Sequence, residues 1–271
     1  MGRVATGLLR PKHPVLGMDF AGIVDAIGEG VTRFAVGDRV FGLAPGGVGA
    51  HAEYLCVPEG RSIARLPDRV RFTEAVVGEG IWYAKTYLDA FALGEGHRLL
   101  VYGASGAIGT AAVQLAKARG AAVTAVVDTR HVELARSLGA DRVVDYTRED
   151  FTRADDDLDF VLDAVGKTHF PEARRLLKPE GVYSASDFGP NSQNLLWWLL
   201  SPLMRTRRFI FPLPKAPRAA VETAAALLDT DEFRAVVDRV LPLEAIVDAY
   251  RYVEQGQKTG IVVVEVAPEG P

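Results

Sequence analysis

The most constraining stretch of this sequence is a short apolar strand that runs into closely spaced glycines and then into a helix. Residues 99–102 are apolar, and residues 110–119 are predicted to be helical. A turn of this kind leaves backbone N–H groups free at the N-terminus of a helix, where the helix dipole favours an anion. The pattern predicts a dinucleotide-binding turn made of Gly103, Ala104, Ser105, Gly106, Ala107, Ile108 and Gly109.

Two of these glycines have an expected structural role in such a turn. Gly106 would let the backbone approach a pyrophosphate, and Gly109 would let the helix pack closely on its strand. The spacing departs from the usual fingerprint, because Ala104 stands where its first glycine is expected and Gly103 precedes it. Since glycine is also the default residue of tight turns, a purely structural turn is the alternative interpretation.

The segment after the turn favours a cofactor site. Residues 121–127 predict a second buried strand that ends at Asp128, 19 residues beyond Gly109. An acidic residue at about this distance is the one that binds the adenosine ribose.

Strands and helices alternate between residues 85 and 231, which predicts a parallel sheet with helices on both faces. Strands are expected at residues 98–102, 121–127, 142–145, 158–163, 180–185 and 208–211, and helices at 106–119, 131–138 and 167–177. Six strands complete a doubly wound sheet of the Rossmann type, so the predicted fold class is α/β.

The two ends of the chain differ from this middle part. Residues 1–84 are rich in glycine and contain short β-like runs at 21–24, 39–42 and 52–57, which predict a small β domain. Residues 232–271 contain a predicted helix at 243–255 and a β-branched strand at 261–266. We expect this last strand to return to the β domain.

Composition and charge exclude several classes of protein. The chain has 271 residues, enough for two domains, and its net charge of −4 argues against a nucleic-acid or anionic-membrane surface. Its one cysteine, Cys56, fits a reducing compartment. Residues 1–7 lack the apolar stretch of a signal peptide, and the apolar run at 195–204 is too short to span a bilayer. We therefore expect a cytoplasmic protein.

Several segments, taken in order, resemble the zinc-independent branch of the medium-chain dehydrogenase/reductases, which includes quinone and enal reductases. They are Leu16–Val24, Phe34–Gly42, Ala50–Tyr54, the strand–turn–helix run 99–117, Ser137–Asp141, Asp145-Tyr146 and Tyr252–Gly260. The resemblance implies a GroES-like catalytic domain at 1–84, a Rossmann domain at 85–231 and a return to the catalytic domain at 232–271. Family members usually carry a further segment ahead of Arg3, so the β domain is expected to be partial. A truncated gene model is the preferred explanation, and a reduced relative is the alternative.

The residues predict no metal site. A catalytic zinc needs three protein ligands, and Met18-Asp19 stands where the zinc-dependent branch has a His-Glu pair. Cys56 alone excludes a four-cysteine site. The histidines show no ligand spacing, and we interpret them as mostly surface or turn residues: His13, His51, His97, His131 and His169.

The type of cofactor depends on Asp128, Thr129 and Arg130. A carboxylate at the end of the second strand would bind the ribose hydroxyl of NAD and repel a 2′-phosphate, whereas an arginine two residues later offers that phosphate a planar partner. In the resembled branch a small hydroxyl residue usually stands in place of Asp128, and an arginine matching Arg130 gives a preference for NADP. We expect NADP(H) to be slightly preferred over NAD(H). A solvated Arg130 opening the helix at 131–138 is the alternative.

Other cofactor contacts follow from position in the sheet and from the resemblance. Tyr146 follows the third strand and is expected to flank the adenine, while Asp163 is expected to be structural. The ends of the fourth and fifth strands lie at the carboxyl edge where ligands bind, which adds Ala164, Val165, Gly166, Ser186, Asp187 and Phe188.

Catalytic residues are sought in residues 79–84, a segment that lies beside the nicotinamide in the resembled family. Tyr83 is expected to offer a hydroxyl to the substrate and Glu79 to act as a buried polar support. Core packing of an amphipathic helix is an equally weighted alternative for both. The apolar run around Trp197-Trp198 predicts an apolar substrate cleft, a dimer contact or a buried helix.

The function expected from these observations is NAD(P)H-dependent hydride transfer to a quinone, enal, enone or related carbonyl, with a small-molecule substrate and a homodimer as the family's frequent assembly. Two alternatives stay open. One is a catalytically weak dinucleotide-binding protein with an incomplete active site, and the other is an NAD(P)-dependent alcohol dehydrogenase acting without metal.

Overall fold

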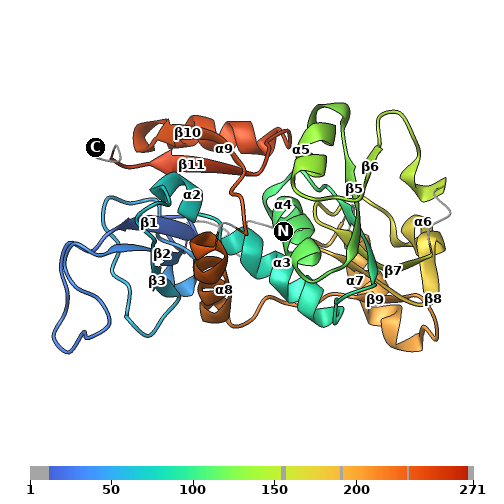
Figure 1. Cartoon of the computed structure of the whole chain (residues 1–271), viewed down its shortest axis with the longest axis horizontal. Coiled ribbons are helices and arrows are strands. Elements are labelled where there is room, and N and C mark those ends of the chain that lie inside the picture. Colours follow the sequence, from blue (N-terminus) through green and yellow to red (C-terminus); the bar gives the residue numbers. More distant parts are fainter. Residues whose placement is uncertain (1–11, 154–156, 190–191, 231, 268–271) are drawn as a thin grey trace. The chain divides into compact units, whose positions relative to one another are not determined.

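The computed structural model describes residues 12–153, 157–189, 192–230 and 232–267. The chain divides into two compact units, residues 1–79 with 216–271 and residues 80–215. The labels used below are those of Figure 1. The first seven residues, in which we expect no signal peptide, lie outside the described residues.

The unit formed by residues 80–215 contains a six-stranded parallel sheet, which confirms the α/β prediction. Its strand order is β6 (Arg142–Asp145), β5 (Ala122–Val127), β4 (Arg98–Tyr102), β7 (Leu158–Asp163), β8 (Leu177–Ala185) and β9 (Arg208–Ile210). The central strands are almost fully buried, as expected for a parallel sheet covered on both faces.

Helical segments precede the first of these strands in the chain and connect the others (Figure 1). They are α3 (Gly78–Ala90), α4 (Ala107–Ala118), η2 (Thr129–His131), α5 (Val132–Ser137), η3 (Phe151–Arg153), α6 (Phe170–Ala173), η4 (Arg174–Leu176), α7 (Gln193–Leu200) and η6 (Ser201–Leu203). The core beside β8 is aromatic, with Phe170, Tyr183 and Phe209 packed against one another.

The helix predicted at 167–177 is shorter than expected. Pro171 lies in the first turn of α6, where proline favours a helix start. At the other end, Leu177 pairs with Leu158 of β7, so the backbone is already extended there and β8 begins at residue 177 rather than 180. Sheet pairing, which the local sequence does not show, sets this boundary.

The unit formed by residues 1–79 and 216–271 has two small sheets. One is antiparallel, with β1 (Asp19–Ile23), β2 (Arg39–Leu43) and β3 (Ile63–Arg65). The other pairs β10 (Val237–Pro242) with β11 (Ile261–Glu265) in parallel. The remaining elements are η1 (Pro45–Gly47), α2 (Phe72–Ala75), α8 (Pro217–Asp229), η7 (Leu243–Ala245) and α9 (Ile246–Glu254).

One β prediction in this unit is wrong and another is confirmed. Residues 52–57 form no strand: none of them is buried, three are exposed, and β3 is the strand that pairs with β2 on the side away from β1. That pairing is close: a Cβ on Gly42 would overlap the Ser62 carbonyl. The strand at 261–265 pairs with β10 and belongs to the same compact unit as residues 1–79, which confirms its predicted return to the β domain.

Candidate functional site at the carboxyl edge of the sheet

The glycine turn lies between β4 and α4. Gly103 has a φ of 76°, in the left-handed region, and a Cβ there would lie 2.7 Å from the Val165 side chain. A Cβ on Gly109 would overlap the Gly103 carbonyl oxygen, which confirms that Gly109 brings the helix close to its strand. A Cβ on Gly106 would meet only that same oxygen, at 3.7 Å, so the turn is open above Gly106.

The N-terminus of α4 is a site of positive potential. Gly106 is its N-cap and has no side chain with which to cap the helix. The N–H groups of the first turn, from Ala107 to Gly109, have no partner within the helix. Ala104 is buried beneath the turn, while Ser105, Ala107 and Ile108 are half-buried. Such a helix start is suited to bind the pyrophosphate of a dinucleotide.

At the end of β5, Asp128 and Arg130 form an ion pair with each other. The guanidinium reaches one carboxylate oxygen of Asp128 through Nε at 3.2 Å and Nη2 at 2.8 Å, and Nδ1 of His131 lies 2.5 Å from the other. Partial burial tends to raise the pKa of Asp128, but Arg130 and His131 together hold it below its usual value. The Arg130 side chain is 63% exposed, against 16% for Asp128, so the guanidinium is the group presented to solvent.

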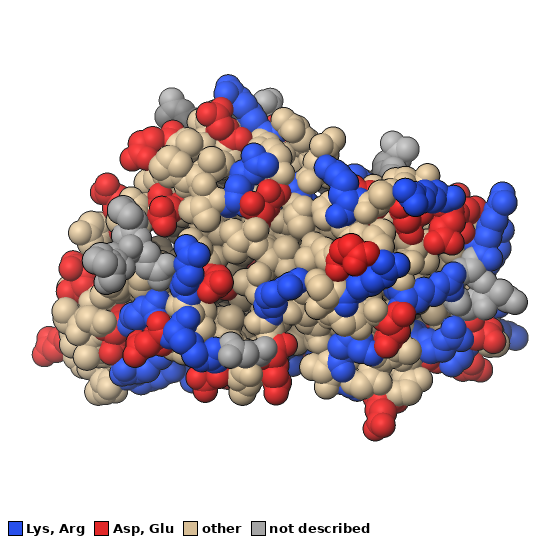
Figure 2. All heavy atoms as spheres, turned by 45° about the horizontal axis from the view of Figure 1, so that its top comes forward, with Lys and Arg blue, Asp and Glu red and all other residues tan. Residues whose placement is uncertain are grey.

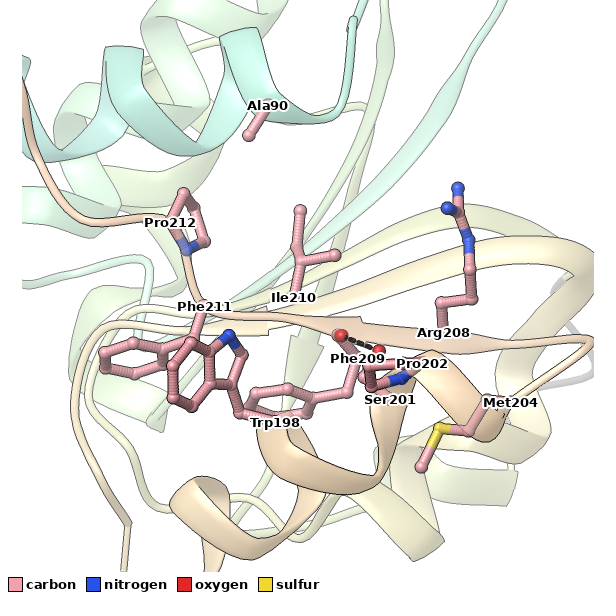
Figure 3. A pocket seen from close by; sticks show the side chains of 10 residues that line it. All are labelled: Ala90, Trp198, Ser201, Pro202, Met204, Arg208, Phe209, Ile210, Phe211 and Pro212. Carbon is pink, nitrogen blue, oxygen red and sulfur yellow. Dashed lines mark hydrogen bonds between the residues drawn. The ribbon is translucent and has the colours of Figure 1, made fainter.

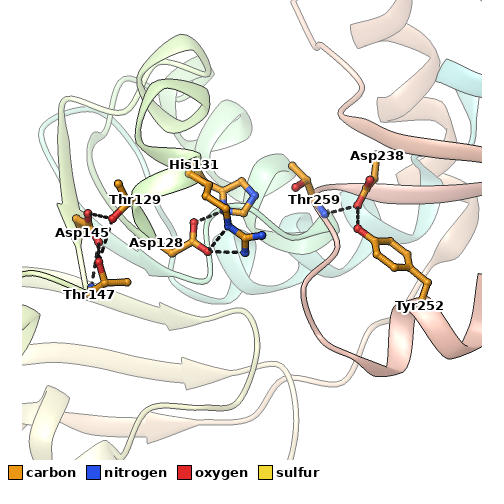
Figure 4. A network of polar contacts seen from close by, with 9 residues as sticks. Asp128, Thr129, His131, Asp145, Thr147, Asp238, Tyr252 and Thr259 are labelled. Atoms are coloured by element: carbon orange, nitrogen blue, oxygen red, sulfur yellow. Dashed lines mark hydrogen bonds and ion pairs between the residues drawn. The ribbon is translucent and has the colours of Figure 1, made fainter.

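His131 is the last residue of the turn η2 and is buried there. The Thr129 hydroxyl donates a hydrogen bond to the carboxylate of Asp145, at the end of β6, with an O–O distance of 2.6 Å (Figure 4). Hydrogen bonds from Thr129 and Thr147 lower the pKa of the Asp145 carboxyl. Thr129 therefore joins the ends of two strands.

Tyr146 is half exposed beside this edge. Its ring lies 6.1 Å from that of Tyr102, and both line an open hollow of about 440 Å³ with residues 147–151. The ring is thus placed where a planar group can lie against it.

The ends of β7 and β8 meet next to the glycine turn. Val165 lies against Gly103, and Gly166, with a φ of 64°, lies against Asp187: a Cβ there would overlap its carboxylate. Phe188 stacks on Phe211 with ring centroids 5.3 Å apart. The structure thus brings the glycine turn together with Ala164, Val165, Gly166, Ser186, Asp187 and Phe188.

Asp163 has the structural role expected of it. Its buried carboxylate accepts hydrogen bonds from the backbone of Val165 and from both the backbone and hydroxyl of Thr168. Burial raises its pKa despite these bonds.

Two acidic residues, Asp19 and Glu79, lie together in the unit of residues 1–79 and 216–271, a contact that the sequence did not reveal. The carboxylate of Asp19, at the start of β1, accepts a hydrogen bond from the Glu79 backbone, with N–O distances of 3.1 and 3.3 Å. Burial, followed by the charge of Glu79, raises the pKa of Asp19 to about 7. Glu79 is an exposed residue, which corrects the expectation that it is buried. Partial desolvation of its carboxyl nevertheless raises its pKa, against the opposing charge of Lys258.

Lys258 stands out in the sequence only as part of a segment that carries the family resemblance. Burial lowers the pKa of its ammonium group, which donates to the Gly260 carbonyl. A residue pair such as Asp19 and Glu79, 60 positions apart, leaves no local pattern in a sequence.

Tyr83 lies four residues after Glu79 on α3 and is half-buried. Its ring packs against Trp82 and Tyr87, at centroid distances of 5.9 and 6.4 Å. The indole of Trp82 donates to the Lys215 carbonyl at 2.7 Å.

Two further observations concern the described ranges only. Among them, no three His, Cys, Asp or Glu side chains are grouped so that they could hold a metal ion. No helix there is both long and apolar enough to cross a bilayer. Figure 2 shows acidic and basic side chains interspersed over the face in view, without one extended basic region.

Comparison with known proteins identifies the family. Residues 2–68 match the alcohol dehydrogenase GroES-like domain, and residues 138–264 match a model described as zinc-binding dehydrogenase. The Arabidopsis thaliana chloroplast envelope quinone oxidoreductase homolog is 30% identical over 97% of this chain and 84% of its own length. The chain belongs to the medium-chain dehydrogenase/reductase family. More narrowly, it belongs to the quinone oxidoreductase branch, and it is thus an oxidoreductase.

Other relatives agree. The 2-methylene-furan-3-one reductase of Solanum lycopersicum is 31% identical over 95% of this chain, which spans 65% of the length of that relative. The quinone oxidoreductase of Coxiella burnetii superposes with a TM-score of 0.84 at 26% identity, covering 96% of this chain and 81% of the other.

Proposed function

We propose that this medium-chain reductase uses a reduced nicotinamide dinucleotide to reduce a quinone, or the conjugated double bond of an enal or enone. The observation that carries the proposal is the turn at 103–109, open above Gly106 and followed by the uncapped start of α4. The printed names of the tomato reductase and of the quinone oxidoreductase relatives support the substrate class.

The residues of this edge fit such a cofactor. Gly103 and Gly109 make the turn tight, and Gly106 leaves space for a pyrophosphate against the backbone. Tyr146 offers a ring to the adenine, and the loops at 164–166 and 186–188 hold the remaining part of the molecule. When bound, the nicotinamide supplies the hydride, while the protein positions the reactants.

For the cofactor type we propose a preference for NADP(H). The Asp128 charge is compensated by Arg130 and His131, so it repels a 2′-phosphate less than a free carboxylate would. The exposed Arg130 guanidinium presents donors that match a phosphate. NAD(H) is the second candidate, because a carboxylate stands at the end of β5.

Within the reaction we assign Tyr83 the role of offering its hydroxyl to the substrate and Glu79 that of a polar support. Asp19 holds the Glu79 backbone at the start of α3. We include no metal, because Met18, with a thioether that is a poor zinc ligand, stands where the zinc-dependent branch has histidine.

We further propose a homodimer, as the resemblance implies, and a reducing compartment such as the cytoplasm, which the single Cys56 supports. Light scattering gives the mass, and a value for one chain would refute the dimer.

The experiment that tests the function is oxidation of NADPH and NADH by the purified chain across a panel of quinones, enals, enones and saturated aldehydes. We expect turnover with quinones or conjugated carbonyls. Cofactor binding without turnover of any compound would instead indicate a catalytically weak dinucleotide-binding protein. Turnover of saturated aldehydes alone would indicate an alcohol dehydrogenase.

A further inference from the structure

Reduction of a quinone or of a conjugated carbonyl consumes one proton for each hydride. The substrate that takes up the hydride becomes an oxyanion, which is the phenolate of a hydroquinone or the enolate of an enal or enone. A side chain can give this oxyanion its proton if it stays protonated close to neutral pH and exchanges protons with water.

The open hollow beside β9 offers no such group. It has a volume of about 550 Å³ and lies beside α7, η6 and β9 (Figure 3). Among the described residues that line it, the one charged side chain is Arg208, and the Ser201 hydroxyl donates to the Phe209 carbonyl. Helix α7 exposes Trp198 and Leu199, at 46% and 62%, so it is not the buried helix considered from the sequence.

The start of α3, in contrast, lies against the turn proposed to hold the dinucleotide. A Cβ on Gly80 would lie 2.9 Å from the carbonyl oxygen of Ala107, the first residue of α4. Glu79 is bonded to Gly80, so their Cα atoms are about 3.8 Å apart. Glu79 is an exposed residue. Its carboxyl is therefore attached next to the turn and can exchange protons with water.

Glu79 also shares a helix face with Tyr83, to which we assigned the hydroxyl offered to the substrate. The two residues are four positions apart on α3. Side chains at this spacing lie one above the other, with Cβ atoms about 5–6 Å apart. An acid at position 79 is thus a neighbour of the group that holds the substrate oxygen.

The surroundings of Glu79 favour its protonated form. Partial desolvation raises the pKa of its carboxyl, although the charge of Lys258 opposes this effect. Asp19 lies behind it and accepts a hydrogen bond from the Glu79 N–H, and two carboxyls so placed disfavour ionisation of both. Burial lowers the pKa of Lys258, whereas the charges of Glu79 and Asp238 raise it.

The other titratable groups packed around β1 leave this balance unchanged. Helix α2, which packs on β1, carries Glu74, whose carboxylate accepts a hydrogen bond from the Arg71 backbone. The His51 ring lies beside Gly17, and burial lowers its pKa, which favours the neutral imidazole. Among the described residues, Lys258 is therefore the charge that opposes protonation of Glu79.

We propose, on the basis of the function proposed above, that Glu79 is the proton donor of the reaction and that Tyr83 holds the substrate oxygen. The hydride reaches the substrate with its electron pair, which oxidises the nicotinamide and leaves a negative charge on the substrate oxygen. The O–H bond of the Glu79 carboxyl then breaks, and its proton forms the O–H bond of the hydroquinone or the enol. The Glu79 carboxylate takes a new proton from water.

The first test compares Glu79→Gln with the parent and with Glu29→Gln, which changes an exposed glutamate of the same unit. With saturating NADPH and the best substrate of the panel, the kcat of the parent should fall as rising pH ionises Glu79. Glu79→Gln should lose about a hundredfold or more in kcat, together with this pH dependence, and keep its NADPH affinity and melting temperature. Glu29→Gln should behave as the parent does.

Two outcomes of this test are contrary, and they differ from each other. A Glu79→Gln protein with the kcat and pH profile of the parent would overturn the proposal; if Tyr83→Phe then lost them, tyrosine would be the donor. A parent that turns over no compound would refute the proposed function, and the proton donor with it.

Lys258→Met tests the same carboxyl without changing it. Loss of the ammonium charge should raise the pKa of Glu79 and move the fall of kcat to higher pH by about one unit; no shift, or a shift to lower pH, would contradict the proposal. Carbon-13 NMR of glutamate carboxyls in the cofactor-free chain gives a readout without turnover. One resonance, absent from Glu79→Gln, should titrate above the ordinary glutamate range, and higher still in Lys258→Met. A Glu79 resonance that titrates within or below that range would overturn the proposal.

Discussion

The raised pKa of Asp19 makes the stability of this protein depend on pH. In the folded chain the pKa of this carboxyl is about 7, against a reference value of 3.8. Between these values the folded state holds a proton that the unfolded state has lost. The free energy of unfolding therefore falls as the pH rises from about 4 to about 7, by at most about 4 kcal/mol.

Asp19→Asn removes this titration while keeping an amide oxygen that can accept the Glu79 N–H. We expect the variant and the parent to have similar stability near pH 4. At pH 8 the variant should be more stable by up to about 4 kcal/mol, because the parent then carries a charge in a desolvated place. Urea unfolding of both proteins at a series of pH values measures the difference, in which titrating groups that do not interact with Asp19 cancel.

Asp25→Asn is the matched control, because Asp25 is an exposed carboxyl in the same unit. Its stability relative to the parent should change little over this range. The reasoning is refuted if the difference between Asp19→Asn and the parent stays constant from pH 4 to pH 8, or if it shrinks as the pH rises.

Two further substitutions test the sheet edge. Arg130→Ala should weaken NADPH binding about tenfold or more, because hydrogen bonds from a charged group to a phosphate are among the strong ones. The same substitution should change NADH binding far less. Titration calorimetry measures both affinities, and an unchanged affinity for NADPH would exclude a phosphate contact. Gly109→Ala should destabilise the fold by more than about 2 kcal/mol, because its Cβ would overlap the Gly103 carbonyl. A melting temperature equal to that of the parent would show that α4 does not approach the strand so closely.

The fold was predictable where residue type alone sets the conformation. Central strands such as β4 and β7 are buried on both faces and are therefore nearly continuous apolar runs. Boundaries set by a distant partner were not predictable: Leu177 is extended because it pairs with Leu158, and β3, rather than residues 52–57, is the strand that pairs with β2.

The same distinction holds for the candidate site. Gly103 and Gly109 could be recognised because a positive φ or a missing Cβ is a property of the residue itself. In the sequence Asp128 and Arg130 are competing signals, and only side-chain geometry shows that they form one ion pair. The contact between Asp19 and the start of α3 depends on how the fold brings distant residues together.

The most direct test of the central claim, that the turn at 103–109 holds a dinucleotide, is the NADPH affinity of Gly106→Val. A side chain at Gly106 points into open space, so the variant should fold and melt as the parent does. Gly94→Val, also in open space and in the same unit, is the control. We expect Gly106→Val to lose NADPH binding at least about a hundredfold, because a branched side chain would occupy the place of the pyrophosphate, and Gly94→Val to retain it. A folded Gly106→Val protein that binds NADPH as tightly as the parent would contradict the account.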